Sequence, residues 1–204
     1  MLNYGFELSN IDGSEFVYEN ENVIIPTEFS YMKNLPKVLN QGEDPICVPC
    51  SISAWCEYKL STKSGIKKDS KFKLFDIFNS RTSEGEGMSC KEAFSYMKNI
   101  GATYGKNNKI KIDSYYRVTS ILHLRNAIIN NGPCIIALPV YDQYKDEFWI
   151  EDGPLQGYHA VSVVGYDKNG FIIRNSWGQG FGVNGYAYLC NEDFGYILEA
   201  WTLI

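Results

Sequence analysis

Hydrophobic and polar residues follow two different patterns, one in each half of this chain. Between residues 47 and 60, apolar side chains recur every three to four positions, which predicts a helix that begins at Cys47. The same pattern predicts helices over residues 89–100 and 119–131, each followed directly by a glycine that stops it. Residues 61–75 are polar and basic, which predicts a loop.

In the second half of the chain the period changes to short apolar runs separated by Gly, Asp and Asn. Such runs are typical of strands in a packed sheet or barrel. Helices come first and strands afterwards, so we expect an α+β fold rather than alternating α/β. A cleft between a helical lobe and a β lobe is the natural place for a binding site. The four predicted strands are CIIALPVY, HAVSVVGY, GFIIRNSW and GYAYLC.

The chain is long enough to form one domain with a real core. It has no internal repeat and no low-complexity linker. We therefore expect a single catalytic domain over residues 1–204. Residues 1–26 would form an N-terminal arm, residues from about 27 to 112 a mainly helical lobe, and residues from about 113 to 204 a mainly β lobe.

The net charge of −5 and the pI near 5.1 argue against a nucleic-acid partner, because phosphate contacts need a basic face. No apolar run approaches the roughly 20 residues needed to cross a bilayer. The first 25 residues mix Asn, Glu, Asp and Tyr and do not resemble a signal peptide. The expectation is a cytoplasmic monomer, or a secreted protein if a precursor segment has been removed.

The six cysteines are expected to be free thiols, because a chain of this length needs no disulfides for stability. A zinc site is disfavoured, since the single C-x-x-C spacing has no second closely spaced pair after it. We expect neither a metal nor another cofactor. The six are Cys47, Cys50, Cys56, Cys90, Cys134 and Cys190.

A cysteine attacks carbonyl groups as a thiolate, which a helix N-terminus and a nearby histidine favour. Cys47 opens the first predicted helix, and the chain has only two histidines. His123 lies inside an amphipathic helical segment, where a packed or surface role is more common. His159 stands at the head of a strand run, from which it can point into a cleft.

Three segments occur in the order NQGEDPIC, GYHAVSVVGYD and RNSWGQGFGVNGYAYL. Together they strongly resemble the papain family of cysteine peptidases. In that family a glutamine lies six residues before the nucleophile, as Gln41 does before Cys47. The family's histidine opens an apolar strand, as His159 does, and its asparagine follows sixteen residues later in an Asn-Ser-Trp-Gly motif, as Asn175 does. The resemblance runs from about residue 27 to the C-terminus and is greatest for short bacterial-type members.

The resemblance implies a papain-like fold, with a helical lobe, an antiparallel β-barrel-like lobe and the active-site cleft between them. It implies that Cys47 is the nucleophile, His159 the acid and base, and Asn175 the residue that orients the imidazole. Gln41 and the Cys47 backbone N–H would form the oxyanion hole. Trp177 would shield the His159–Asn175 hydrogen bond from water. The substrate would be a peptide or protein.

The same family pattern indicates residues that bind the substrate. Gly85 and Gly87, in a Glu-Gly-Glu-Gly run, would leave backbone groups free to pair with an extended peptide. Tyr158 is a candidate wall residue of the substrate pocket, as are Tyr141 and Phe148. No propeptide-like segment precedes residue 27, so the means by which activity would be restrained stays open.

Three alternatives stay open. The better-known family signature places the reactive cysteine second in its C-x-x-C run, which would make Cys50 the nucleophile. The run Cys-Val-Pro-Cys also resembles a thioredoxin-type redox motif, although the expected βαβ context is missing. A catalytically weak protein that keeps the fold to bind peptides is the third. The spacing from Gln41 favours Cys47 over Cys50.

Overall fold

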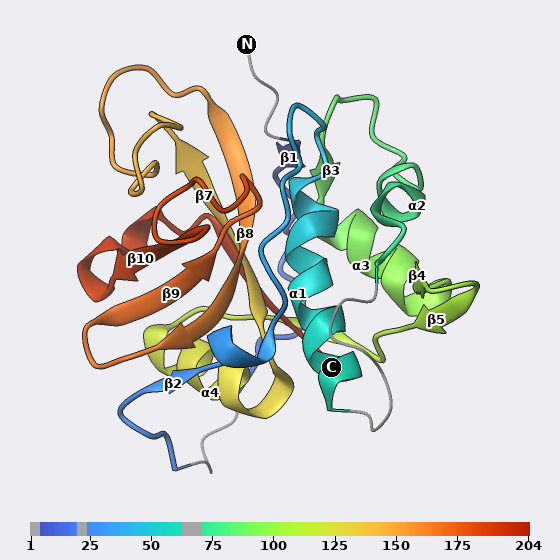
Figure 1. Cartoon of the computed structure of the whole chain (residues 1–204), viewed down its shortest axis with the longest axis horizontal. Helices are drawn as coiled ribbons and strands as arrows, with labels where there is room; N and C mark the ends of the chain where they lie inside the picture. Colours follow the sequence, from blue (N-terminus) through green and yellow to red (C-terminus); the bar gives the residue numbers. More distant parts are fainter. Residues whose placement is uncertain (1–4, 20–23, 63–70) are drawn as a thin grey trace.

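The computed structural model describes residues 5–19, 24–62 and 71–204. Three helices lie on one side of the molecule, and a large sheet with the fourth helix lies on the other (Figure 1). Most of the loop expected over residues 61–75 lies outside the described residues. The helices are α1 (Cys47–Ser61), α2 (Leu74–Phe78), α3 (Cys90–Asn99) and α4 (Ile121–Asn131).

The large sheet is antiparallel, with the strand order β10-β9-β8-β7-β11-β6 and with β2 paired to β8. Among the described residues this path has two ends and does not close into a ring. The fold is α+β as expected, and the barrel-like lobe is an open sheet. Its strands are β2 (Phe29–Ser30), β6 (Tyr115–Arg117), β7 (Cys134–Val140), β8 (Gly157–Tyr166), β9 (Gly170–Arg174), β10 (Tyr186–Cys190) and β11 (Glu199–Leu203).

Two small strand pairs lie outside the large sheet. The first strand of the chain, β1 (Phe6–Glu7), pairs in parallel with β3 (Met88–Ser89). The pair β4 (Ala102–Tyr104) and β5 (Asn108–Ile110) forms a hairpin after α3. Two 3-10 helices complete the description, η1 (Met32–Asn34) and η2 (Asn191–Tyr196).

The predicted helices form where their end signals stand. Ser89 accepts the backbone N–H of Glu92, whose carboxylate accepts the N–H of Ser89 in return, and this capping box starts α3. Ser120 caps α4 in the same way through the N–H of His123. None of the helices in the described part of the chain is both long and apolar enough to cross a membrane.

Helix α1 is the central packing element, and this explains why it has no polar face for most of its length. It lies between the two buried clusters of the molecule, and nearly all of its side chains are buried. The hydroxyl of Ser162 on β8 donates to the carbonyl of Ser51 on α1 at 2.9 Å. This bond holds the first turns of α1 against the strand that carries His159.

A buried ion pair also joins α1 to β9. Arg174 Nη2 lies 3.0 Å from Glu57 Oε2, and the two side chains are 3% and 6% exposed. Burial raises the pKa of Glu57 to about 7, and Arg174 opposes that rise. Because Asn175 follows Arg174 directly, this pair determines where the end of β9 lies relative to α1.

Replacement of Arg174 by Met is expected to lower the free energy of unfolding by about 3–5 kcal/mol, because it leaves the Glu57 carboxylate buried without a partner. Denaturant unfolding measures this loss. Lys168→Met, an exposed change in the turn between β8 and β9, is the control and should stay within about 0.5 kcal/mol. The double variant Arg174→Met/Glu57→Leu should recover most of the loss. A double variant as unstable as the single one would contradict this account.

Candidate active site

The structure brings His159 and Asn175 into direct contact in the interior. His159 Nε2 lies 2.8 Å from Asn175 Oδ1, with the two residues 0% and 3% exposed. The backbone N–H of Ser176 donates to the same Oδ1 at 2.7 Å, which identifies that atom as the amide oxygen. An amide oxygen only accepts, so Nε2 must carry the proton and Nδ1 is the basic nitrogen of the neutral ring.

Aromatic rings enclose this hydrogen bond. Trp177 stacks on His159 with ring centroids 4.6 Å apart and planes at 22°. Gly178, at φ +80°, makes the turn that brings Trp177 over the imidazole. Phe148 packs edge-on to His159 at 5.7 Å and is fully buried. The expectation that Phe148 lines the substrate cleft was therefore wrong, because it lies behind the histidine in the core of the β lobe.

Cys47 is the first residue of α1, and its side chain is fully buried. Burial raises the pKa of its thiol to about 12, and the backbone N–H groups of Ala160, Val48 and Cys47 lower it in part. The thiol therefore lies beside the strand residue that follows His159. With its side chain shielded from water, Cys47 is a neutral thiol, because the N–H groups near the helix start do not offset the energetic cost of burying a thiolate.

Cys50 lies one helical turn further along α1, in a different environment. Burial raises the pKa of its thiol, and the charges near it include those of Arg174 and Glu57. It lines a small cavity with Ala160 of β8 and with Arg174 and Asn175 at the end of β9. Of the two candidate cysteines, only Cys47 is at the free N-terminus of the helix, where the backbone N–H of Ala160 points at its thiol.

Gln41 joins the site through Ser176. Its Oε1 accepts the Ser176 hydroxyl at 2.6 Å, and its own backbone N–H donates to the Ser176 carbonyl at 2.8 Å. Its Nε2 donates one hydrogen to the Asp44 carbonyl at 2.9 Å. These bonds hold the mostly buried side-chain amide of Gln41 near the start of α1. The chain turns at Asp44, three residues before the helix, where the N–H of Asp44 donates to the Gln41 carbonyl.

A segment far from the site in sequence covers the thiol side of it. We call residues 5–18 the covering segment. Phe6 belongs to the same buried cluster as Cys47, and a side chain on Gly5 would meet the Pro45 carbonyl oxygen at 2.2 Å. In Figure 1 the strand of this segment, β1, lies beside β3 between the two halves of the molecule. On this side of the site, the segment covers the fully buried Cys47.

The covering segment lies against the two glycines expected to bind substrate. The N–H of Gly87 donates to the Glu7 carboxylate at 3.0 Å, and the N–H of Met88 donates to the Gly5 carbonyl at 2.9 Å. A side chain at Gly85 would meet the Glu7 carboxylate oxygen at 1.7 Å, and one at Gly87 would meet Gly5 at 2.9 Å. Both glycines therefore leave room for an extended chain, which is the covering segment here.

The other side of the site is open. A pocket of about 370 Å³ adjoins Gln41 and Trp177. Of the other two candidate wall residues, both half-buried, Tyr158 packs against the cluster that holds Cys47 and Phe6, whereas Tyr141 pairs through its backbone N–H with the carbonyl of Phe148. The pocket is lined mainly by Asn40, Glu43, Tyr144, Asp146, Phe181 and Gly182.

All six cysteines are free. Across the described ranges, no three His, Cys, Asp or Glu side chains come close enough together to hold a metal ion. The sequence reasoning missed two features of the site. Ser176 stands in the Asn-Ser-Trp-Gly motif, and that position could have indicated its bond to Gln41. The covering segment has no motif, and its place depends on contacts across the whole chain.

Comparison with known proteins places the chain among the cysteine proteases. The model of the papain family cysteine proteases matches residues 56–197, which include His159 and Asn175 and begin after Cys47. A cathepsin L-like proteinase of Phaedon cochleariae is 31% identical over 185 residues, covering 76% of this chain and 56% of that protein. Cathepsin B-like cysteine proteinase 1 of Haemonchus contortus is 30% identical over 105 residues, covering 48% of this chain and 29% of that protein.

Solved structures agree in fold. Xylellain, a cysteine protease from Xylella fastidiosa, superposes with a TM-score of 0.80 at 22% identity and covers 98% of this chain and 95% of its own. Digestive procathepsin L 3 of Tenebrio molitor gives a TM-score of 0.73 at 19% identity, covering 99% and 76%. The chain spans about half or less of the length of the curated relatives named above. Because the family model matches most of the chain and the fold agrees with it, the chain belongs to the papain family of cysteine proteases.

Proposed function

We propose that the protein is a cysteine peptidase in which Cys47 is the nucleophile, His159 the acid and base, and Asn175 the residue that orients the imidazole. The observation that carries this proposal is the buried bond from His159 Nε2 to Asn175 Oδ1, under the ring of Trp177. That bond directs the basic Nδ1 away from Asn175. The thiol of Cys47 lies at the helix start beside Ala160, the next residue on the strand.

The reaction follows from these positions. His159 Nδ1 takes the proton of the Cys47 thiol, and the sulfur attacks the peptide carbonyl carbon. The C–N bond breaks as the imidazolium returns its proton to the leaving amine, which leaves a thioester on Cys47. Neutral His159 then removes a proton from water, whose oxygen attacks the thioester. The C–S bond breaks, the acid leaves, and the Cys47 thiolate takes its proton back from the imidazolium.

Gln41 is proposed to stabilise the oxyanion together with the backbone N–H of Cys47. The first N–H groups of a helix have no partner within the helix, so that of Cys47 can point at a carbonyl oxygen. The bonds of Gln41 to Ser176 and Asp44 support this role, since they hold its amide in place before substrate arrives. Such preorganised donors are each worth about 10²–10³ in rate.

Labelling with an epoxide that alkylates active-site thiols tests the nucleophile. The proposal expects loss of labelling in Cys47→Ala and retention in Cys50→Ala, each identified by peptide mass mapping. Loss in Cys50→Ala alone would overturn the assignment. A folded protein that is never labelled, even when the covering segment is released, would favour a catalytically weak peptide-binding protein. A reversible Cys47–Cys50 disulfide with reductase activity independent of His159 would favour the oxidoreductase reading.

Replacement of Asn175 by Ala is expected to lower kcat/KM by about 10²-fold, because the imidazole loses the acceptor that selects its tautomer. Steady-state kinetics on a fluorogenic peptide measure the loss, with thermal unfolding as a check on the fold. Asn169→Ala, an exposed asparagine in the turn before β9, is the control. An Asn175→Ala enzyme of full activity would contradict the orienting role.

The substrate is proposed to be a peptide or protein whose acyl side lies along Gly85 and Gly87, with Tyr158 as a wall. The absence of a side chain at Gly85 and Gly87, which leaves space for an extended peptide along them, supports this placement of the substrate. The acyl part of a substrate must point its C-terminal end at the thiol, whereas the covering segment has its N-terminal end near Pro45 and runs away from it. The segment thus lies in the reverse direction and offers no peptide bond for cleavage. In this state the enzyme is inactive.

The remaining expectations stay proposals. We propose a monomer in a reducing compartment such as the cytoplasm, supported by six free thiols. The net charge of −5 supports a partner other than nucleic acid. The likeness to short bacterial-type members and the division at about residue 112 also stay predictions.

A further inference from the structure

Two thiols stand one helical turn apart at the start of α1. Cys47 is the first residue of the helix and Cys50 the fourth, and neither belongs to a disulfide. They are 0% and 4% exposed. The proposed reaction uses only Cys47, so the second cysteine of the Cys-Val-Pro-Cys run has no part in it. A thiol this close to a nucleophilic sulfur is a possible reaction partner for it.

Both cysteines lie on the face of α1 that meets β8. The backbone N–H of Ala160 points at the Cys47 thiol, and Cys50 lines a small cavity with the same residue. Residues three apart on a helix are neighbours, with about 5–6 Å between their Cβ atoms, and a disulfide needs about 3.5–4.5 Å. A local shift of about 1–2 Å therefore brings the two cysteines to bonding distance.

The first turn of α1 can make this shift without disturbing the rest of the helix. The first N–H groups of a helix have no partner within it, and Pro49 has no N–H at all. Cys50 is the first residue of α1 whose N–H closes a helical turn, by donating to the Ile46 carbonyl at 2.9 Å. A movement of Cys50 toward Cys47 therefore stretches this one backbone bond.

Cys90 is the rival partner, since it is fully buried and belongs to the same cluster as Cys47. Burial, then the charge of Glu199, then that of Cys47 raise the pKa of the Cys90 thiol. By contrast, Cys47 comes first among the charges that raise the pKa of the Cys50 thiol. This order agrees with the helical spacing, which makes Cys50 the better placed of the two.

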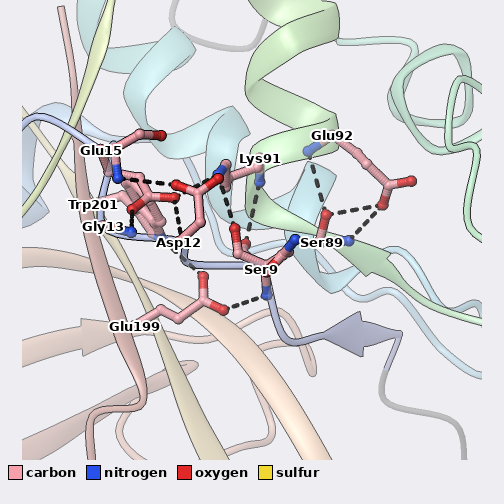
Figure 2. A network of polar contacts seen from close by, with 11 residues as sticks. Ser9, Asp12, Gly13, Glu15, Ser89, Lys91, Glu92, Glu199 and Trp201 are labelled. Atoms are coloured by element: carbon pink, nitrogen blue, oxygen red, sulfur yellow. Dashed lines mark hydrogen bonds and ion pairs between the residues drawn. The ribbon is translucent and has the colours of Figure 1, made fainter.

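The start of α3 also holds Cys90 in place. Cys90 is the first residue of that helix, and the residues on either side of it are bound. Ser89 forms the capping box with Glu92, and Lys91 pairs with Glu15 of the covering segment (Figure 2). The capping box stays when the covering segment leaves, so an approach of Cys90 to α1 would have to break it.

Hydrogen peroxide can oxidise this pair in two balanced steps. The Cys47 sulfur takes one oxygen of the peroxide with its hydrogen, and the O–O bond breaks. The other oxygen leaves as water with its own hydrogen and the thiol proton, and Cys47 becomes a sulfenic acid. The Cys50 sulfur then attacks the Cys47 sulfur, and the hydroxyl leaves as water with the Cys50 proton. Two electrons pass from the thiols to the peroxide, and a dithiol reductant returns them.

We propose that Cys50 is the resolving cysteine of a redox modification site, at which peroxide converts Cys47 and Cys50 to a disulfide and switches the peptidase off reversibly. This inference rests on the proposed function, because the thiolate that catalysis needs is also the form that peroxide attacks. The disulfide protects Cys47 from a second peroxide, which would give an irreversible sulfinic acid. It differs from the oxidoreductase reading, because the disulfide is the inactive form of a peptidase that depends on His159.

The test uses the full chain with Phe6→Asp, which weakens the packing of the covering segment, as the parent. The parent, Cys50→Ala and Cys90→Ala are treated with peroxide, and peptide mass mapping and peptide hydrolysis are measured before and after dithiothreitol. In the parent, the peptide that holds both cysteines should lose two hydrogens, and dithiothreitol should restore most of the activity. Cys50→Ala should instead gain oxygen on Cys47 and recover about fivefold less activity or lower. Cys90→Ala is the matched control and should behave as the parent does.

Cys50→Ser is a second variant that keeps the size of the side chain, with thermal unfolding as the check on the fold. It should lose the reversible recovery as Cys50→Ala does. If both variants recover as fully as the parent, Cys50 has no resolving role.

Three further outcomes overturn the inference. Oxygen gained on Cys47 of the parent without a disulfide, while the reduced protein hydrolyses peptide, removes the switch and leaves the proposed function standing. A disulfide between Cys47 and Cys90 assigns the resolving role to Cys90 instead. A folded, reduced parent that neither hydrolyses peptide nor is alkylated at Cys47 overturns the proposed function together with this inference.

Discussion

Replacement of Cys47 by Ala is expected to lower kcat/KM for peptide hydrolysis on the order of 10⁶-fold, the largest effect of any single change considered. Loss of a hydrolase nucleophile has consequences of this size, because the covalent pathway disappears while binding remains. The side chain is buried at the start of α1 beside Ala160, so removal of one sulfur creates only a small cavity. Steady-state kinetics in the Phe6→Asp background measure the loss.

Cys50→Ala is the matched control, since it removes the same atom one turn along the same helix. It is expected to keep kcat/KM within about threefold, a change of less than 1 kcal/mol. The reason is the position of Cys50, whose backbone N–H already donates to Ile46 within the helix and is not free for an oxyanion. Loss of activity in Cys50→Ala, together with activity in Cys47→Ala, would contradict the account.

Replacement of Phe6 by Asp is expected to increase the rate of Cys47 alkylation about 10- to 10²-fold. Phe6 is 6% exposed and packs in the cluster that holds Cys47. Burial of such a ring contributes about 1.5–3 kcal/mol, and its loss shifts the opening equilibrium of the covering segment by the corresponding factor. Iodoacetamide labelling under native conditions, followed by peptide mass mapping, measures the rate.

Phe16→Asp is the control within the same segment, because Phe16 is 77% exposed. It should leave the rate of alkylation unchanged. The pH dependence adds a second readout: burial raises the pKa of the Cys47 thiol to about 12 in the closed state. Release of the segment admits water and lowers that pKa, so the alkylation profile of Phe6→Asp should move to lower pH. Equal rates and profiles in all three proteins would contradict closure by this segment.

Local signals in the sequence were enough to predict α1, α3 and α4 and the strands β7 to β10, but not α2, β6 or β11. Helix α1 begins at Cys47 as its apolar spacing predicted, and the capping residues Ser89 and Ser120 start α3 and α4. The pairing of His159 with Asn175 could be predicted only from the resemblance, since sixteen residues separate them. The antiparallel register of β8 and β9 is what brings them together.

The closed state could not be predicted, because it depends on contacts between distant segments. The backbone N–H of Ser9 donates to the carboxylate of Glu199, 190 residues further along the chain, and no motif marks that contact. The prediction that Phe148 lines the substrate pocket was wrong for a related reason. An aromatic residue after a strand fits a cleft wall or a core equally well, and only the packing of Trp177 and His159 places it in the core.

The most direct test of the central claim is to trap the acyl-enzyme. The Phe6→Asp protein is mixed with a peptide ester, quenched in acid after a few milliseconds, and digested for peptide mass mapping. The account predicts that the acyl group is attached to Cys47, and that Asn175→Ala slows its formation. An acyl group on Cys50, or hydrolysis of the peptide with no covalent adduct at any time, would contradict it.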